Sequence, residues 1–455
     1  MKIIVIGAVA AGAKAAAKTK RMLPDSVVCI YTDDTHVSYS SCGLPYYIEG
    51  NFEDYRQLLV RSPKEFEAQG INVCLRHKVT KIEPETNTVF VKNLDTGMVF
   101  TDNYDKLIIA TGARPYVPDI KNSGLKNIFT LRKIEDGINI KSQLLKSKHA
   151  VIIGGGYIGL ELLEAFVRQG VKTTLIEHGN RLMKRFDEDM SDIIFDQLYG
   201  ISKGKFDILT SNDVVEFFGD DEGVRGVVTH SNTVKADLVV IASGVLPNSE
   251  LAKNAGILTG VNGAIKVNNR MQTNIENIYA CGDCCEDYMI VSGKPDWIPL
   301  GSTANKEGRS AAINAAGGED IFGGVLGSAV TRCFSLTMSM TGLSVAMAEK
   351  WGYSPVWVSV TKSDKVGFMP DVNNITLKLI ADKNTGLLLG CQAVGTGDAD
   401  KRVNIVTSAL LAKMTARDFY NNDITYAPPY SPTIDPLLNA AQALVSKLEK
   451  DTNRV

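Results

Sequence analysis

Long uninterrupted runs are absent from this sequence. No apolar stretch approaches the ~20 residues that a helix needs to cross a bilayer, and the apolar opening at residues 3–6 is only one strand long. Lysine and arginine form no long cluster, and the formal net charge is −2. We therefore expect no signal peptide, no membrane contact and no nucleic-acid surface, which leaves small metabolites as the expected partners.

The cysteines lack a regular pattern as well. Eight of them are scattered over 455 residues, unlike the spacing of a secreted disulfide framework, so we predict a cytoplasmic protein in a reducing compartment. Cys281, Cys284 and Cys285 form a local cluster. A zinc site needs four ligands and no second pair has suitable spacing, so we interpret these three as structural thiols and expect no metal site.

The first 31 residues have a βαβ pattern. A β-branched run at residues 2–6 predicts a buried strand, Gly7 and Gly12 bound a turn, an alanine-rich helix follows, and Val27–Tyr31 reads as a second strand. Small residues in such a turn let the backbone approach a pyrophosphate at the positive end of the helix. The pattern is therefore typical of a dinucleotide site.

Two departures weaken this pattern. Val9 stands where the middle glycine of G-x-G-x-x-G is usual, and Thr32 stands where an acid is expected, with Asp33 directly after it. A dinucleotide site and a plain strand–helix turn both fit these residues.

A second copy of the pattern, further along the chain, is complete. Gly154 permits the tight turn, Gly156 the close approach of the backbone, and Gly159 the packing of helix on strand, while Glu177 can bind a ribose 2′-hydroxyl. Because a carboxylate repels a 2′-phosphate, NADH is favoured over NADPH, which stays an alternative.

Two such units in one chain indicate one bound flavin dinucleotide and one exchanging nicotinamide nucleotide. Further strands that end in small residues, at 107–112, 238–244 and 278–283, fit this division. We therefore predict an α/β protein with two Rossmann-like nucleotide-binding domains and a C-terminal α+β domain. The expected boundaries are 1–112 with 245–325 for the FAD domain, 113–244 for the NAD(P)H domain and 326–455 for the C-terminal domain.

The pattern of the C-terminal domain is antiparallel. Strands are predicted at Ala329–Met340, Val356–Thr361, Thr376–Ala381 and Leu387–Val394, and helices at Ser344–Trp351, Asp398–Leu411 and Pro436–Leu448. The proline-rich segment 426–432 suits neither a helix nor a central strand. Its tyrosines and prolines indicate an interface or a site element.

One cysteine stands in a loop of unusual composition. Cys42 lies among the small residues of the segment 39–47 and is followed by Gly43 and Pro45, which can open a helix. A thiol reacts as its thiolate, which needs partial exposure and an electropositive or helix N-terminal setting. A buried structural cysteine in a turn is the alternative reading.

These motifs together resemble the flavin-dependent pyridine nucleotide-disulfide oxidoreductases of the single-cysteine type. The CoA-disulfide reductases are the closest likeness, and NADH oxidases and NAD(P)H persulfide or polysulfide reductases are near relatives. The resemblance covers essentially the whole chain and rests on Gly7–Gly12, Ser41–Pro45, Ala110–Gly112, Gly154–Gly159, Gly282 with Asp283, Ile298–Lys306 and Tyr426–Tyr430.

The resemblance implies a homodimer joined by its C-terminal domains, in which NADH reduces FAD and reduced FAD passes electrons to Cys42. The substrate would be CoA disulfide or a related low-molecular-weight disulfide or persulfide. Resting Cys42 would be a mixed disulfide with CoA or, in the oxidase branch, a sulfenic acid.

Roles for single residues also follow from the resemblance. Catalysis would use Cys42 together with Tyr426, reaching from the partner subunit, and Tyr430. CoA would contact Lys18, Arg21, Ser38, Asn305 and Arg309. The cofactors would contact Gly7, Ala10, Ala11, Gly12, Thr32, Asp33, Ser41, Val79, Ala110, Thr111, Gly112, Gly154, Gly156, Tyr157, Ile158, Gly159, Glu177, Gly244, Gly282, Asp283, Leu300, Gly301 and Thr303.

Several positions depart from related enzymes. Tyr47 replaces the second cysteine of two-cysteine reductases, and no histidine follows His230, so the C-terminal acid–base histidine of those enzymes is missing. Phe368 replaces a tyrosine of many CoA-disulfide reductases, as in the oxidases. Ala10 and Ala11 replace the oxidases' histidine. Phe368 thus favours the oxidases, whereas Ala10 and Ala11 leave oxygen reduction without an expected proton donor. An NADH oxidase and a slow redox-sensing flavoprotein stay as alternatives.

Overall fold

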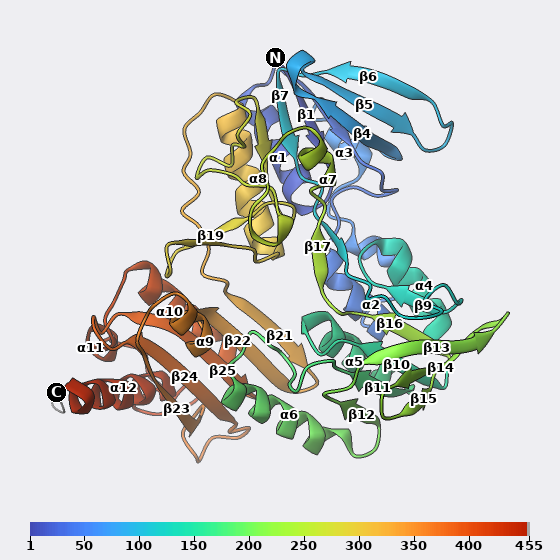
Figure 1. The fold of residues 1–455 in the computed structure, drawn as a ribbon. Helices are drawn as coiled ribbons and strands as arrows, with labels where there is room; N and C mark the ends of the chain where they lie inside the picture. Colours follow the sequence, from blue (N-terminus) through green and yellow to red (C-terminus); the bar gives the residue numbers. More distant parts are fainter. Residues whose placement is uncertain (453–455) are drawn as a thin grey trace.

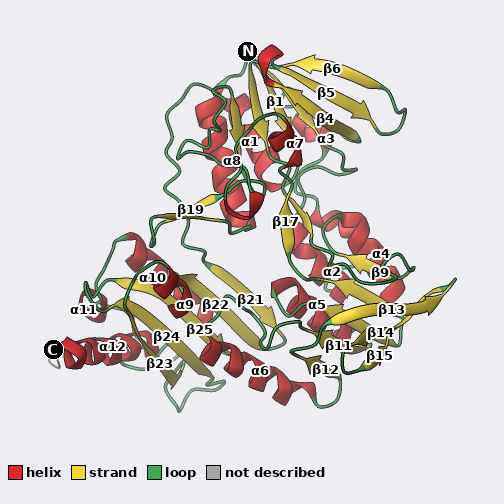
Figure 2. Ribbon diagram, in the orientation of Figure 1, coloured by secondary structure: helices red, strands yellow, loops and turns green. Residues whose placement is uncertain are grey.

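The computed structural model describes residues 1–452 and builds them around three five-stranded sheets (Figure 1). No helix in this part of the chain is both long enough and apolar enough to span a bilayer. Helices flank the sheets, and two smaller antiparallel sheets extend from the first and second of them (Figure 2). The predicted α/β fold, with two Rossmann-like units and a C-terminal α+β unit, is confirmed.

The first sheet is parallel and joins segments from both sides of the second unit. Its strands are buried because nearly all their residues are apolar, and α1 (Ala10–Met22) and α8 (Gly301–Ala315) pack beside each other against it. The strand order is β18 (Ile278–Ala280), β7 (Lys106–Ile109), β1 (Lys2–Ile6), β2 (Val27–Tyr31) and β3 (Ile71–Cys74). An added antiparallel sheet contains β4 (His77–Glu83), β5 (Thr88–Asn93) and β6 (Val99–Asn103).

The second sheet is also parallel. Its order is β12 (Phe206–Leu209), β11 (Lys172–Ile176), β10 (His149–Ile153), β16 (Leu238–Ile241) and β9 (Ile128–Thr130). Its helices are α4 (Ile134–Leu144), α5 (Tyr157–Arg168) and α6 (Glu188–Ser202), and a meander adds β13 (Val214–Asp220), β14 (Gly223–Thr229) and β15 (Thr233–Lys235).

The chain enters and leaves the second unit through one antiparallel pair, β8 (Ala113–Pro115) and β17 (Val245–Pro247). Thr111 Oγ1 donates to the Asn248 carbonyl at 2.6 Å, and Asn248 Nδ2 donates to the Thr111 carbonyl at 2.9 Å. Both crossing segments are thereby held at one point. The exact domain boundaries stay a prediction.

The third sheet is antiparallel. Its order is β21 (Ala329–Cys333), β22 (Leu336–Gly342), β25 (Leu388–Gly395), β24 (Asn374–Asp382) and β23 (Pro355–Ser363). Its helices are α9 (Val345–Lys350), α10 (Ala399–Leu411), α11 (Ala416–Tyr420) and α12 (Pro436–Thr452). The predicted strand Ala329–Met340 is two strands, because the chain turns back at Phe334, whose φ is 54°.

A buried ion pair joins the second and third units. Lys378 Nζ on β24 lies 3.1 Å from an Asp187 oxygen and 2.6 Å from Asp189, at the start of α6, and 4.1 Å from the centre of the Trp357 ring. Asp187 also accepts hydrogen bonds from the Val345 N–H and the Gln392 side chain. Because these charges are paired and hydrogen-bonded, their burial is compensated, and the third sheet is fixed beside the second unit.

Candidate functional site

Backbone contacts set the turns that open the two nucleotide-binding units. Gly7 has φ of 108°, and a Cβ there would lie 2.1 Å from the Ala110 oxygen; a Cβ at Gly12 would lie 2.0 Å from the Gly7 oxygen. The second unit repeats this geometry, since a Cβ at Gly159 would lie 1.9 Å from the Gly154 oxygen. Only glycine permits such a close approach of helix to strand. Each turn therefore delivers its helix directly to the strand ends.

Three helices that begin near the ends of the parallel strands have no side-chain cap. α1, α5 and α8 have no side-chain hydrogen bond at the N-cap and no acid in the first turn, whereas α11 has a complete capping box. Uncapped first-turn N–H groups suit phosphate oxygens. A Cβ at Gly156 would meet nothing within 4 Å, which leaves the backbone open to a ligand. These features fit two dinucleotides.

Most of the predicted cofactor residues lie at these strand and helix ends. They occupy the start of α1 (Gly7, Ala10, Ala11, Gly12), the ends of β2 (Thr32, Asp33), β7 (Ala110, Thr111, Gly112), β16 (Gly244) and β18 (Gly282, Asp283), the start of α5 (Gly154, Gly156, Tyr157, Ile158, Gly159), the end of β11 (Glu177) and the start of α8 (Leu300, Gly301, Thr303). Ser41 lies in the turn before α2 (Leu44–Glu49). Val79 is buried in β4.

Glu177 is held at the end of β11 by its own backbone neighbours. One carboxylate oxygen accepts from the Gly155 N–H at 2.7 Å, and the other accepts from the Gly179 N–H at 2.7 Å. Lys184 Nζ lies 3.1 Å from the second oxygen. The carboxylate is thus fixed at the place where a Rossmann unit binds the adenosine ribose.

The acids after β2 are arranged differently from the expectation. Asp33 is exposed and pairs with Lys133 at 3.2 Å, while Asp34 is buried and accepts from the Tyr39 hydroxyl at 2.9 Å. Thr32 is buried and its hydroxyl accepts from the Asp34 N–H. Asp34 therefore orders the loop that leads to Cys42.

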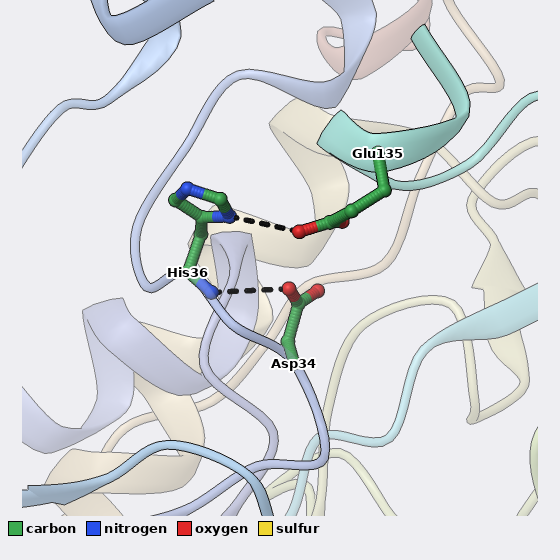
Figure 3. Close-up of side chains that lie close together, drawn as sticks. All are labelled: Asp34, His36 and Glu135. Atoms are coloured by element: carbon green, nitrogen blue, oxygen red, sulfur yellow. Dashed lines mark hydrogen bonds and ion pairs between the residues drawn. The ribbon is translucent and has the colours of Figure 1, made fainter. Parts of the chain in front are cut away.

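Asp34, His36 and Glu135 form a cluster that links this loop to α4 (Figure 3). The His36 N–H donates to Asp34 at 3.1 Å, and His36 Nδ1 lies 3.3 Å from Glu135. Glu135 also accepts from the Thr35 hydroxyl. Because these polar atoms are already bonded to one another, we interpret the cluster as a structural link between the loop after β2 in the first unit and α4 in the second.

Arg132 also reaches from the second unit to the first. Its guanidinium donates to Asp283 at 2.9 Å, and the neighbouring Gly282 N–H donates to Glu307 at 2.7 Å. Sequence reasoning missed Arg132, because nothing in its local pattern distinguishes it from other basic residues between a strand and a helix. Its position beside Asp283 makes it a residue that could hold an anionic part of a cofactor.

The thiol of Cys42 faces the start of α8. The residue is exposed and lies in the short turn Ser41–Gly43, directly before α2. A Cβ at Gly301 would lie 4.0 Å from Cys42 Sγ. The structure therefore brings Cys42 together with Gly301, which the sequence placed more than 250 residues away.

The electrostatic setting of Cys42 differs from the electropositive one that we expected. Partial desolvation by the surrounding protein raises the pKa of the Cys42 thiol, and the carboxylates of Glu161 and Asp283 raise it further. Arg132 and a hydrogen bond with Ser41 lower it. Two acids and one cation thus act electrostatically on the sulfur. The acids arrive from α5 and from the end of β18, so the local sequence around Cys42 did not reveal them.

Glu161 is the second residue that sequence reasoning missed. It follows Tyr157 by one turn of α5 and accepts a hydrogen bond from the Thr331 hydroxyl at 3.0 Å. Burial raises the pKa of Glu161 to about 7, and Glu164 adds to the rise. The i to i+4 spacing from Tyr157 was the available signal. Glu161 can therefore gain or lose a proton near neutral pH, and its charge raises the pKa of the Cys42 thiol.

Tyr157 has a polar atom that the protein does not satisfy. Its hydroxyl is buried and has no hydrogen-bond partner among residues 1–452. Buried hydroxyl groups are normally bonded. An orphan hydroxyl at the start of α5 fits a ligand at this point, as expected for the nicotinamide site.

The predicted CoA residues lie on the outer faces of α1 and α8. These helices pack closely, since a Cβ at Gly308 would lie 2.3 Å from the Ala11 oxygen. Arg21, Asn305 and Arg309 are exposed, and Lys18 is half-buried. Within the described chain none of these cations forms an ion pair. Ser38 lies in the adjoining loop with φ of 51°. The charges are available to an anionic ligand.

The two candidate tyrosines are not near Cys42 within one chain. Tyr426 and Tyr430 are 49% and 75% exposed, between α11 and α12. The ribbon joining these helices lies well apart from α2 (Figure 1). Phe368 is 79% exposed in the same unit. A role for Tyr426 at Cys42 therefore requires a second subunit.

Comparisons with known proteins agree with this geometry. The profile of the pyridine nucleotide-disulphide oxidoreductases matches residues 1–308, and the profile of the family's dimerisation domain matches residues 329–437. The chain is 37% identical over 447 residues to the NAD(P)H coenzyme A polysulfide/persulfide reductase of Pyrococcus horikoshii, covering 97% of this chain and 98% of that protein.

Two further similarities show the range of named activities. An NADH oxidase of Methanocaldococcus jannaschii is 32% identical over 453 residues, covering 98% of this chain and 99% of that one. The solved NAD-dependent persulfide reductase from A. fulgidus matches with a TM-score of 0.95 and 35% identity, covering 99% of this chain and 84% of that one.

Glu161→Gln should increase the reactivity of Cys42 above pH 7. The carboxylate that forms as the pH rises through about 7 opposes ionisation of the thiol, and the neutral amide does not. We expect alkylation of reduced Cys42 by iodoacetamide at pH 8 to be about three- to tenfold faster in the variant. Below pH 6 the two proteins should react alike.

Thr331→Val provides the companion measurement. Loss of its hydrogen bond should raise the pKa of Glu161 further, so Glu161 should stay neutral to a higher pH. The inhibition of Cys42 alkylation by the Glu161 carboxylate should then begin at a higher pH than in wild type. Identical pH profiles for Glu161→Gln and wild type would show that Glu161 does not act on the thiol.

Proposed function

Because the chain belongs to the pyridine nucleotide-disulphide oxidoreductase family, and is an FAD-dependent NAD(P)H oxidoreductase, we propose that it reduces a low-molecular-weight disulfide or persulfide at Cys42. CoA disulfide is the first candidate. One observation carries this proposal: Cys42 is an exposed thiol at the start of α8, and buried Tyr47 occupies the position of a second cysteine. The partner sulfur must therefore come from a substrate.

The reaction begins with the thiolate of Cys42. It attacks one sulfur of the disulfide RSSR, forms the mixed disulfide Cys42–S–S–R and releases RS⁻. Bound FAD would supply the two electrons taken from NAD(P)H that cleave this mixed disulfide. This cleavage regenerates the Cys42 thiolate and releases a second RS⁻, which takes up a proton. Glu161 is well placed to hold or release a proton during this cycle.

The nucleotide sites follow from the helix starts. The first-turn N–H groups of α1 and α8 would hold FAD, with Asp283 and Arg132 beside it, and those of α5 would hold NAD(P)H. Glu177 favours NADH, because its fixed carboxylate repels a 2′-phosphate. The other cofactor residues named from the sequence are part of this proposal.

The cations of α1 and α8 support a CoA-like substrate. Lys18, Arg21 and Arg309 are unpaired within the described chain, and Asn305 lies one turn before Arg309. CoA carries phosphates at the end opposite its sulfur, so a ligand with sulfur at Cys42 and phosphate on these helices fits the charges. The relative from Pyrococcus horikoshii is named for coenzyme A.

The C-terminal unit makes a homodimer part of the proposal. Tyr426 and Tyr430 lie inside the segment that matches the dimerisation domain. We place Tyr426 of one subunit at Cys42 of its partner, where its hydroxyl would protonate the departing thiolate. A cytosolic location, where free thiols persist, belongs to the same proposal.

An NADH oxidase is the second candidate. Relatives with this name match nearly the whole chain. Phe368 stands where many CoA-disulfide reductases have a tyrosine, and in this it is like the oxidases. Ala10 and Ala11 speak against it, because they provide no proton donor in the first turn. A slow redox-sensing flavoprotein is the third candidate.

The choice of acceptor separates these candidates. Purified protein should oxidise NADH with CoA disulfide under argon faster than with air alone. Activity with oxygen only would favour the oxidase. Retained FAD without turnover on any disulfide, polysulfide or oxygen would favour the sensor.

Cys42→Ser should retain FAD and its reduction by NADH but lose disulfide turnover by several orders of magnitude, because the flavin site uses other residues. Flavin absorbance and steady-state rates measure both properties. Cys391→Ala, at a buried thiol in β25 of the third sheet, is the control and should keep wild-type turnover. Normal turnover in Cys42→Ser would refute the role of the thiol.

Tyr426→Phe should slow turnover by about a hundredfold through loss of the proton donor, with little effect on FAD binding. Tyr420→Phe, in the same unit at the end of α11, is the matched control. An unchanged pH–rate profile in Tyr426→Phe would exclude this donor, and a defect in Tyr430→Phe alone would assign the proton to Tyr430.

A further inference from the structure

A second pair of thiols lies outside the site described above. Cys29 on β2 and Cys74 on β3 have their sulfur atoms 3.9 Å apart. The two strands are neighbours, with Tyr31 opposite Cys74 in the register. Nothing in the proposed reaction uses either cysteine.

The pair opens into a cavity. A hollow of about 430 Å³ is lined by both cysteines together with Lys2, Tyr31, Glu67 and Asp102. Cys29 is 5% exposed, whereas Cys74 is only half-buried. A small molecule can therefore reach Cys74 first, and Cys29 lies behind it.

The surrounding groups shift the pKa values of the two thiols in opposite directions. The contact with Cys29 lowers the pKa of the Cys74 thiol, and His77 lowers it further, against the effects of burial and of Asp102. The same contact and burial raise the pKa of Cys29. Asp102 is bonded to Lys2 and to the Tyr31 hydroxyl. Together with its greater exposure, this makes Cys74 the better nucleophile of the pair.

We propose that Cys29 and Cys74 are a second redox site, a dithiol that low-molecular-weight disulfides oxidise. The Cys74 thiolate attacks RSSR, forms Cys74–S–S–R and releases RS⁻. Cys29 then loses its proton and attacks the Cys74 sulfur, which forms Cys29–S–S–Cys74 and releases a second RS⁻. Two electrons pass from the dithiol to RSSR, which becomes two thiols. The site goes beyond the proposed function, since Cys42 takes no part.

The fold allows this bond to form. A disulfide is ~2.05 Å long, so the sulfur atoms must approach by about 2 Å. Cys74 lies at the end of β3, which is the edge strand of its sheet and is held by a strand on one side only. Because Cys29 pairs with Asn72 and Cys74 pairs with Tyr31, closing the bond requires β3 to slide along β2, which its position at the sheet edge permits.

Other cysteines provide internal references. The thiols of Cys284 and Cys285 are fully buried and donate to main-chain oxygens. Cys333 is also buried and donates to the Leu160 oxygen. Their burial excludes a disulfide reagent, so they should stay reduced while Cys74 reacts.

The test uses FAD-loaded Cys42→Ser protein, which removes the first redox thiol. The protein is reduced, freed of reductant under argon and exposed to glutathione disulfide at pH 8, then quenched with an alkylating reagent and mapped by mass spectrometry. We expect loss of two hydrogen atoms and a cross-linked Cys29–Cys74 peptide, formed at least tenfold faster than modification of any other cysteine.

Single variants separate the steps. In the Cys29→Ser background the reaction should stop with one glutathione on Cys74, and in the Cys74→Ser background neither product should form. Cys29→Ala replaces Cys29→Ser if the buried serine prevents folding, which FAD absorbance reports. Glutathione that persists on Cys74 while Cys29 is present, or equal oxidation at Cys333, would overturn the proposal. Because no turnover is measured, these outcomes leave the role of Cys42 untouched.

Discussion

The rest of this structure depends on one constraint: at a few glycines the backbone of a helix lies so close to the backbone of the preceding turn that no side chain would fit. A Cβ at Gly12 or at Gly159 would lie about 2 Å from a carbonyl oxygen of the preceding turn. The helix can then start directly at the strand end, with its first N–H groups uncapped. The same constraint thus produces both nucleotide sites, because a separation of even one methyl group would move the helix starts away from the sheet edge.

The position of Cys42 follows from this packing. Gly308 lets α8 lie against Ala11 of α1, and the start of α8 then meets the Cys42 turn. Arg132 and Glu161 arrive from the second unit, which the Lys378 ion pair and the crossing strands β8 and β17 hold in place. The cysteine therefore lies between the first and second units, and the third unit acts on it only through the hydrogen bond of Thr331 to Glu161.

Prediction from the sequence succeeded where the signal was local. The strands around Gly7 and Gly154 have buried, β-branched residues next to turn glycines, and their ends were placed within one or two residues. The hairpin at Phe334 was missed because its turn contains neither glycine nor proline at the reversal. Arg132 and Glu161 were missed for another reason: each acts on a residue more than one hundred positions away.

The sequence by itself determined the class of the protein, because glycine turns, apolar strands and the absence of a second cysteine near Cys42 are properties of neighbouring residues. Only the tertiary structure decided the charges that face that cysteine and the meeting of Cys29 with Cys74. Electrostatic effects and sulfur contacts depend on distances in space, and those distances arise from how strands far apart in the chain are ordered within a sheet.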